Sequence, residues 1–274
     1  MYATLSADIV SSTSLSKEGT IELKQKIDSL FQLLGEKFPG FWGRQIKGDY
    51  IECLIPNVSN SFRIALIIKS YIKSITLPEI KQSKSFQTYG IRIAVGIGEM
   101  RIVDKQEGIL DGEAIYLSGR AIENMTSPNK GTLSIHINND IQPSALNTIA
   151  VLADALMNNA TKKQSEVLFY KLLSVKEEDI AEKLGISQPG VNSHSSSAKW
   201  YCIEEALNYF EQIKFENYEY YIVFELSIGS HHRRFLSAIR QVLRTKRKEK
   251  IQELVPICTC YNHRFVILDN SSIL

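Results

Sequence analysis

The stretch Tyr2-Ala-Thr-Leu-Ser-Ala-Asp-Ile-Val-Ser-Ser-Thr-Ser-Leu-Ser16 opens the chain and decides the fold that the sequence predicts. Its first residues form a short apolar run, which is typical of a buried strand. Asp8 stands at the end of this strand, and the small residues Ser11, Ser12 and Thr13 favour a tight turn with exposed backbone N–H groups. A carboxylate beside such a turn can hold a divalent metal against phosphate oxygens. An acid at this place can also simply cap the next helix.

Helices and strands are expected to alternate along the next 130 residues. The order β-α-β-β-α-β, followed by a further helix and strand, predicts an α+β fold of the ferredoxin-like (split βαβ) type. Such a fold is an antiparallel sheet with helices on one face. The expected helices are 18–38, 57–74 and 114–125, separated by a loop at 76–88 among others, and the expected strands are 41–46, 50–55, 89–97 and 131–137.

A second acid stands at a strand boundary. Lys47-Gly48-Asp49 is a hairpin turn between two strand-like runs. In a split βαβ sheet the first strand neighbours this hairpin, so Asp8 and Asp49 are expected at one edge. Two carboxylates that converge repel each other unless a cation lies between them. Mg²⁺ or Mn²⁺ together with a phosphate ligand is therefore the expected occupant.

Four landmarks resemble those of class III nucleotidyl cyclase homology domains. They are Ala7-Asp-Ile-Val-Ser-Ser-Thr13, Lys47-Gly-Asp49, Arg92-Ile-Ala-Val-Gly-Ile-Gly98 and Asp111-Gly-Glu-Ala-Ile-Tyr-Leu-Ser-Gly-Arg120. The chain is still more similar to SatD-family proteins, a bacterial group that shares these landmarks and ends in a helix-turn-helix. The resemblance covers about residues 1–140, and about 1–213 with the second segment.

The resemblance implies roles for individual residues. Asp8 and Asp49 match the metal carboxylates of the cyclases, and Ile9 would offer its backbone carbonyl. Arg120 matches the arginine that stabilises negative charge in the transition state. A nucleotide would contact Ser11, Ser12, Thr13 and Gln45. Because cyclases of this type build their site across a dimer, the resemblance also implies a homodimer.

Three positions depart from the cyclase pattern. Gln45 stands where adenylyl cyclases carry a base-reading lysine, and Tyr116 stands where they carry asparagine. Ile109 replaces the acid expected about two residues before Asp111. We therefore expect little or no cyclic AMP formation; if activity survives, it would be that of a nucleotidyl cyclase.

Residues 141–215 predict a helix-turn-helix domain. Thr161 caps one expected helix, and the frame Ile180-Ala181, Leu184-Gly185-Ile186-Ser187, Val191 describes the next two. In this frame Ala181 allows close helix contact, Gly185 makes the turn and Ser187 caps the following helix. The segment resembles the helix-turn-helix of sigma factor region 4.

The recognition helix is expected to begin at Ser187. Glutamine and asparagine can bind adenine edges, and serine can bind phosphate. Cations are few in this segment, and some helix-turn-helix units bind protein instead of DNA, so both partners remain open. The expected DNA-binding residues are Gln188, Asn192, Ser193, Ser196 and Lys199, with Ser195 also expected on the exposed side.

Composition limits the remaining possibilities. The net charge of the 274-residue chain is only +2, so any nucleic-acid surface must be local. No segment approaches transmembrane length, and the four scattered cysteines suit reduced thiols, so a cytoplasmic protein without a membrane partner is expected. Residues 216–274 form a basic extension of uncertain fold, in which a strand at 220–228, an amphipathic helix at 233–254 and a strand at 260–268 are expected. Its Cys258-x-Cys260 and His263 do not have the usual spacing of a zinc site.

Together these features predict a DNA-binding regulator with three parts. Residues 1–140 would form a cyclase-like domain that senses a nucleotide or metal, residues 141–215 the helix-turn-helix, and residues 216–274 the extension. Two alternatives remain. The chain would otherwise be a divergent nucleotidyl cyclase with an accessory helix-turn-helix, or a pseudoenzyme that scaffolds protein partners.

Overall fold

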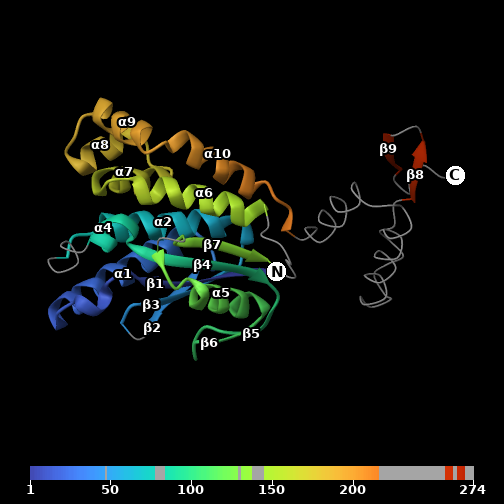
Figure 1. Cartoon of the computed structure of the whole chain (residues 1–274), viewed down its shortest axis with the longest axis horizontal. Coiled ribbons are helices and arrows are strands. Elements are labelled where there is room, and N and C mark those ends of the chain that lie inside the picture. Colours follow the sequence, from blue (N-terminus) through green and yellow to red (C-terminus); the bar gives the residue numbers. More distant parts are fainter. Residues whose placement is uncertain are drawn as a thin grey trace. The chain divides into compact units, whose positions relative to one another are not determined.

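Figure 1 shows the computed structural model of the chain. It describes residues 1–46, 48–77, 84–128, 131–137, 145–215, 257–261 and 264–268. The chain divides into two compact units, Met1–Phe215 and Glu216–Leu274, and each is described by itself.

A five-stranded sheet forms the centre of the first unit. Its strands are β1 (Tyr2–Ile9), β2 (Trp42–Ile46), β3 (Tyr50–Ile55), β4 (Ile91–Gly98) and β7 (Leu133–Ile137). Their order across the sheet is β2-β3-β1-β4-β7. All neighbouring strands are antiparallel except β4 and β7, which are parallel. The opening stretch is therefore the central strand, hydrogen-bonded on both sides.

Helices and a second hairpin connect these strands. They are α1 (Lys17–Lys37), α2 (Ser61–Ser74), α4 (Lys84–Tyr89), β5 (Met100–Asp104), β6 (Ile109–Gly112) and α5 (Glu113–Asn124), with the 3₁₀ turns η1 (Ser12–Ser14) and η2 (Val58–Asn60). Apart from α4 and the β5–β6 hairpin, the elements follow one another in the predicted order, and the α+β class is confirmed. α4 lies almost entirely in the segment 76–88 that was predicted to be a loop, and it buries Phe86.

Helices cover both faces of the sheet (Figure 1). On one face, a Cβ at Gly43 of β2 would lie 3.1 Å from the ring of Phe31 in α1. On the other face, Ser118 of α5 bonds to Thr4 at 2.9 Å and to Ser6 at 3.0 Å, both in β1. The prediction that all helices lie on one face is therefore wrong. Side chains alternate along β1, so Thr4 and Ser6 point to the α5 face, where Ser118 satisfies their hydroxyls.

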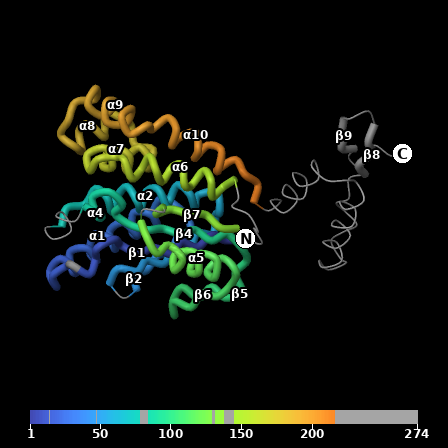
Figure 2. Tube along the Cα trace, viewed as in Figure 1, coloured from blue at the N-terminus to red at the C-terminus, as the bar shows by residue number. Residues whose placement is uncertain are grey.

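Five further helices form a layer that packs on α2. They are α6 (Ala145–Asn159), α7 (Lys162–Leu172), α8 (Glu177–Leu184), α9 (Gln188–Ser197) and α10 (Trp200–Glu211). The ring of Phe62 in α2 lies 5.3 Å from that of Phe210 in α10, and Tyr71 lies 5.2 Å from Phe169 in α7. The predicted boundary at residue 140 falls outside the described residues. The segments on its two sides pack together in one unit, with α2 between the sheet and the layer (Figure 2).

A buried polar network joins α2, α6 and the sheet. The Lys69 ammonium lies 3.0 Å from a carboxylate oxygen of Asp154 in α6, and both side chains are almost fully buried. Thr132 donates to both oxygens of that carboxylate at 2.7 Å, through its backbone N–H and its hydroxyl. One turn after Lys69, Lys73 donates to the carbonyls of Met157 at 2.8 Å and Asn158 at 2.6 Å. The last turn of α6 is thereby bonded to α2.

Lys73 should make the stability of the first unit depend on pH. Burial and the Lys69 ammonium lower the pKa of Lys73 to about 7, while Asp154 acts in the opposite direction. In the unfolded chain the pKa of Lys73 is about 10.4. Below pH 7 both states bind the proton; between pH 7 and 10 only the unfolded state does. The free energy of unfolding should therefore rise with pH by up to ~1.4 kcal/mol per unit.

Denaturant titrations at pH 7, 8 and 9 measure this slope. Lys73→Met should flatten it, whereas Lys24→Met, which removes an exposed lysine of α1, should leave it unchanged. An equal slope in the wild type and in Lys73→Met would assign the pH dependence to other groups.

The second unit contains one described hairpin, formed by β8 (Ile257–Tyr261) and β9 (Arg264–Leu268) in antiparallel pairing. It replaces the single strand predicted at 260–268. The strand predicted at 220–228 and the helix predicted at 233–254 lie outside the described residues, as does His263. None of the helices in the described ranges combines the length and the apolar character needed to cross a membrane.

Candidate functional site

The two predicted metal carboxylates lie at the same end of the sheet. In the register of the sheet, Asp8 is opposite Tyr50 of β3 on one side and Arg92 of β4 on the other. Asp49 directly precedes Tyr50, and its carbonyl accepts a hydrogen bond from the backbone N–H of Ile9 at 3.4 Å. The fold thus brings Asp8, Ile9 and Asp49 together, as the sequence predicts.

Each carboxylate is already bound by a side chain of the protein. Asp8 Oδ2 accepts from Arg92 Nε at 3.1 Å and also from Arg92 Nη2. The third nitrogen of this guanidinium, Nη1, donates to the carbonyl of Met125, just after α5. Asp49 Oδ2 accepts from the Ser12 hydroxyl at 2.5 Å. Arg92 is a residue of this site for which the sequence predicts no role.

The predicted turn after β1 is present. Ser11 has a left-handed backbone with φ of 63°, and Ser12 starts the 3₁₀ turn η1, which includes Thr13. The N-cap of α1 is Ser16, whose side chain accepts from the backbone N–H of Gly19 at 3.1 Å. Asp8 is bound by Arg92 instead, so the alternative in which Asp8 caps the next helix is wrong.

Tyr50, which lies opposite Asp8 in the β1–β3 ladder, is an uncharged residue beside the Asp8–Arg92 pair. It is hydrogen-bonded to Ser6, next to Asp8 on the same face of β1. Burial raises the pKa of Tyr50; the Ser6 bond lowers it, and the carboxylates of Glu52, Glu123 and Asp8 raise it again. Tyr50 therefore remains a protonated phenol at neutral pH.

Gln45 does not join this group. Along β2 the side chains alternate, and Arg44 bonds Glu52 at 2.8 Å on the Asp8 face, so Gln45 is directed to the α1 face. There its amide nitrogen donates to the carbonyl of Gly48 within the hairpin. Its amide oxygen is buried and has no hydrogen-bond partner among the described residues. A nucleotide base held near Asp8 would be on the other side of the sheet.

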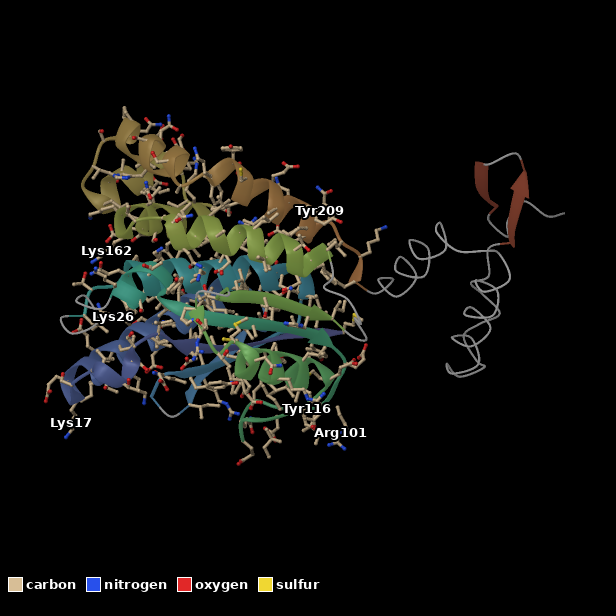
Figure 3. The ribbon with its side chains drawn as sticks, viewed as in Figure 1. Lys17, Lys26, Arg101, Tyr116, Lys162 and Tyr209 are labelled. Atoms are coloured by element: carbon tan, nitrogen blue, oxygen red, sulfur yellow. The ribbon has the colours of Figure 1, made fainter. Side chains whose placement is uncertain are left out.

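Arg120 is exposed on α5 and bonds to neither acid among the described residues. One turn before Arg120 on α5, Tyr116 donates to Asp111, and Arg101 forms an ion pair with the same carboxylate. Figure 3 shows Arg101 and Tyr116 side by side. The Tyr116 hydrogen bond, followed by that of Arg101, lowers the pKa of Asp111. The hydroxyl of Tyr116 is thus already hydrogen-bonded to Asp111.

The metal donors at the sheet end are few. Nowhere in the described ranges do three or more His, Cys, Asp or Glu side chains form a group suited to hold a metal. Asp8, Asp49 and a carbonyl would therefore leave half of the positions of a hexacoordinate Mg²⁺ to water or phosphate oxygens, as that ion often allows.

The second candidate region is formed by α7, α8 and α9. Their shared core consists of Val167, Ile180 and Val191, one from each helix. The turn between α8 and α9 is closed by Gly185, which has φ of 62°, and the N–H of Ile186 bonds the carbonyl of Ala181 at 3.0 Å. This is the usual end of a helix at a left-handed glycine.

The helix ends in this region have the caps predicted for them. The side chain of Ser187 accepts from the backbone N–H of Gly190 at 3.3 Å at the start of α9. Thr161 and Gln164 form a capping box at the start of α7. Both caps satisfy backbone donors that would otherwise lack a partner.

The predicted recognition residues lie on the solvent side of α9 or just after it. Gln188, Asn192, Ser193, Ser196 and Lys199 are all exposed. Ser195 was also expected there, but it is buried and its hydroxyl donates to the carbonyl of Asn192 at 3.0 Å. Asn192 Oδ1 in turn accepts from the Ser196 hydroxyl at 3.2 Å.

Charges around α9 are nearly balanced. Lys199 is exposed, but Lys163 lies 2.9 Å from Glu166, and Lys162 donates to Thr76. The first turn of α8 is acidic, with Glu177, Glu178 and Asp179. This surface therefore offers little non-specific attraction for phosphate.

Comparison of the sequence with models of protein families and with curated proteins returned no match.

Proposed function

We propose that the chain is a DNA-binding regulator that recognises its target through α8 and α9 as a helix-turn-helix. The observation that carries this proposal is the row of exposed, uncharged polar side chains on α9, held by the Val167–Ile180–Val191 core. In helix-turn-helix proteins the second helix enters the major groove, and the residues near its N-terminus contact the bases. The cap at Ser187 and the turn at Gly185 support the same assignment.

Gln188 and Asn192 are the residues best suited to base contact. They are four positions apart, so both extend from one side of α9. Their amides can form paired hydrogen bonds with the N6 and N7 atoms of adenine. The Ser196 bond to Asn192 Oδ1 restrains the rotation of that amide, which favours one orientation of its donor.

The nearly balanced charge around α9 limits how strongly one copy of the chain would bind DNA. A surface with few free cations, such as that around α9, gains little affinity from phosphates alone. A homodimer that binds two half-sites would compensate, because both recognition helices contribute at once. We therefore propose a homodimer acting in the bacterial cytoplasm.

Replacing Gln188 with alanine should relax sequence preference at one position of the site. Loss of a bidentate base contact typically costs about 1–3 kcal/mol against the preferred base. The test is selection of bound sequences from a random DNA pool at physiological salt, with wild type and Gln188→Ala in parallel. Gln212→Ala, the same change at an exposed residue beside α10, is the matched control and should retain the wild-type motif.

If the wild type enriches no motif and gives no gel shift, the helix-turn-helix is a protein-interaction module. That result would favour the scaffold alternative over the DNA-binding one.

A second candidate function belongs to the sheet. We propose that residues 1–140 are a cyclase-like, ferredoxin-like domain, since the split βαβ topology has the strand order β2-β3-β1-β4 seen here. The shared location of Asp8 and Asp49 favours a site for Mg²⁺ or Mn²⁺ with a nucleotide phosphate. The direction of Gln45 and the Tyr116–Asp111 bond argue against purine recognition and turnover as in the cyclases, so a ligand-sensing role is favoured over catalysis.

A further inference from the structure

Arg92 binds one of the two carboxylates of the proposed metal site, that of Asp8. It lies directly across from Asp8 in the β1–β4 ladder, and both side chains are about three-quarters buried, with 24% and 23% of their surface exposed. Partial burial protects such a pair from screening by salt. The attraction between Arg92 and Asp8 is therefore stronger than that of a fully exposed surface ion pair.

The guanidinium is fixed in position on two sides. Its Nε and Nη2 bond to Asp8 Oδ2, and its Nη1 bonds to the carbonyl of Met125. The guanidinium of arginine is planar and always protonated. Because that of Arg92 is hydrogen-bonded on both sides, it keeps its charge and its position beside Asp8. Asp8 is consequently neutralised by the protein itself.

The two acids of the proposed metal site differ in this respect. Asp49 is bound by Ser12, whose hydroxyl is neutral and leaves the negative charge of Asp49 in place. Asp8 has its charge cancelled. A divalent cation that bound Asp8 while Arg92 stayed would lie close to a like charge, which is unfavourable at such short range.

We propose that Arg92 is an internal counter-ion that competes with a divalent cation for Asp8. The inference rests on the proposed metal site of the cyclase-like domain, and it identifies Arg92 as the residue that controls the affinity of that site for the cation. Asp49 then provides the initial attachment of the metal, and full coordination requires Arg92 to release Asp8. At low metal concentration Arg92 remains bound to Asp8, and the site holds no metal.

The experiment is a calorimetric titration of the full chain with Mn²⁺ alone, in the wild type and in Arg92→Met. Removing the competitor should tighten Mn²⁺ binding at least tenfold. The double variant Arg92→Met/Asp8→Asn should lose that gain, because the released carboxylate is then absent. Arg44→Met is the matched control: it removes an arginine that pairs with Glu52 on the same face of the sheet, and it should not tighten binding.

The outcomes separate this inference from the metal site itself. Equal, measurable Mn²⁺ affinity in the wild type and in Arg92→Met overturns the competition and leaves the metal site standing. Absence of Mn²⁺ binding in every variant overturns both. If Arg92→Met proves unfolded by circular dichroism, Arg92→Gln takes its place with the same expectation, since its amide can still donate to Met125.

Discussion

Asp154→Asn should lower the free energy of unfolding by about 3–5 kcal/mol, the usual cost of removing one partner from a buried ion pair. Lys69 would be left charged at a site where burial already lowers its pKa and Asp154 is the group that raises it. An amide cannot replace the carboxylate. Whichever oxygen becomes NH₂ would face a donor, either the backbone N–H of Thr132 or the Thr132 hydroxyl and the Lys69 ammonium. Equilibrium denaturation in guanidinium chloride measures the change.

Two further variants make that result specific. Glu166→Gln breaks the Lys163–Glu166 pair on the surface of α7 by the same chemical change, and it should cost no more than about 1 kcal/mol. The double variant Asp154→Leu/Lys69→Met removes both charges, so it should be less destabilised than Asp154→Asn. A loss in Asp154→Asn as small as that in Glu166→Gln would mean that Lys69 finds another partner or becomes neutral.

Gly96→Ala should be the most damaging small change in the sheet. A Cβ at Gly96 would overlap the carbonyl oxygen of Ala114 and lie 2.6 Å from the backbone nitrogen of Ser118, both in α5. These are backbone atoms of a helix, so they cannot yield as a flexible side chain would. Either α5 moves away from β4 or the sheet distorts, at a cost of about 3 kcal/mol. Thermal and denaturant unfolding of the purified variant measure this loss.

Gly119→Ala is the matched control for Gly96→Ala. Gly119 lies in the middle of α5, and a Cβ there would meet no atom within 4 Å. Because alanine has the higher helix propensity, this variant should gain about 0.5–1 kcal/mol. If the two alanine variants had the same stability, α5 would not pack as tightly on β4 as the structure shows.

Much of the fold was accessible from local patterns in the sequence. The turn at Gly185 and the caps at Ser187 and Thr161 follow from chemistry within a few residues of each helix end. The packing of the helical layer on α2 was missed, although a signal was present. Residues on every side of α2 are apolar, and a helix that is apolar all round must be covered all round. The two lysines of α2, Lys69 and Lys73, are buried and bond to α6.

The candidate site was predicted only in part. The convergence of Asp8 and Asp49 follows from strand order, because the first strand of a split βαβ sheet lies beside the hairpin. The Arg92–Asp8 pair depends on strand register, and a slip of one residue moves a side chain to the other face. The face of Gln45 depends on register in the same way. Neither could be derived from residue spacing alone.

The attachment of the helical layer to α2 has a consequence for synthesis on the ribosome. Arg63 of α2 and its partner Glu211 of α10 are 148 positions apart, and they are joined by a bidentate contact at 2.5 and 3.2 Å. At ordinary translation speeds α2 leaves the exit tunnel about 7–30 s before α10 does. α7 emerges earlier than α10 and can cover Tyr71 with Phe169. Phe62, however, lacks its partner Phe210 until α10 emerges, so this part of α2 remains an exposed apolar surface on a nascent chain whose sheet is already complete. Chaperone binding to this side should therefore be brief and should end when α10 emerges.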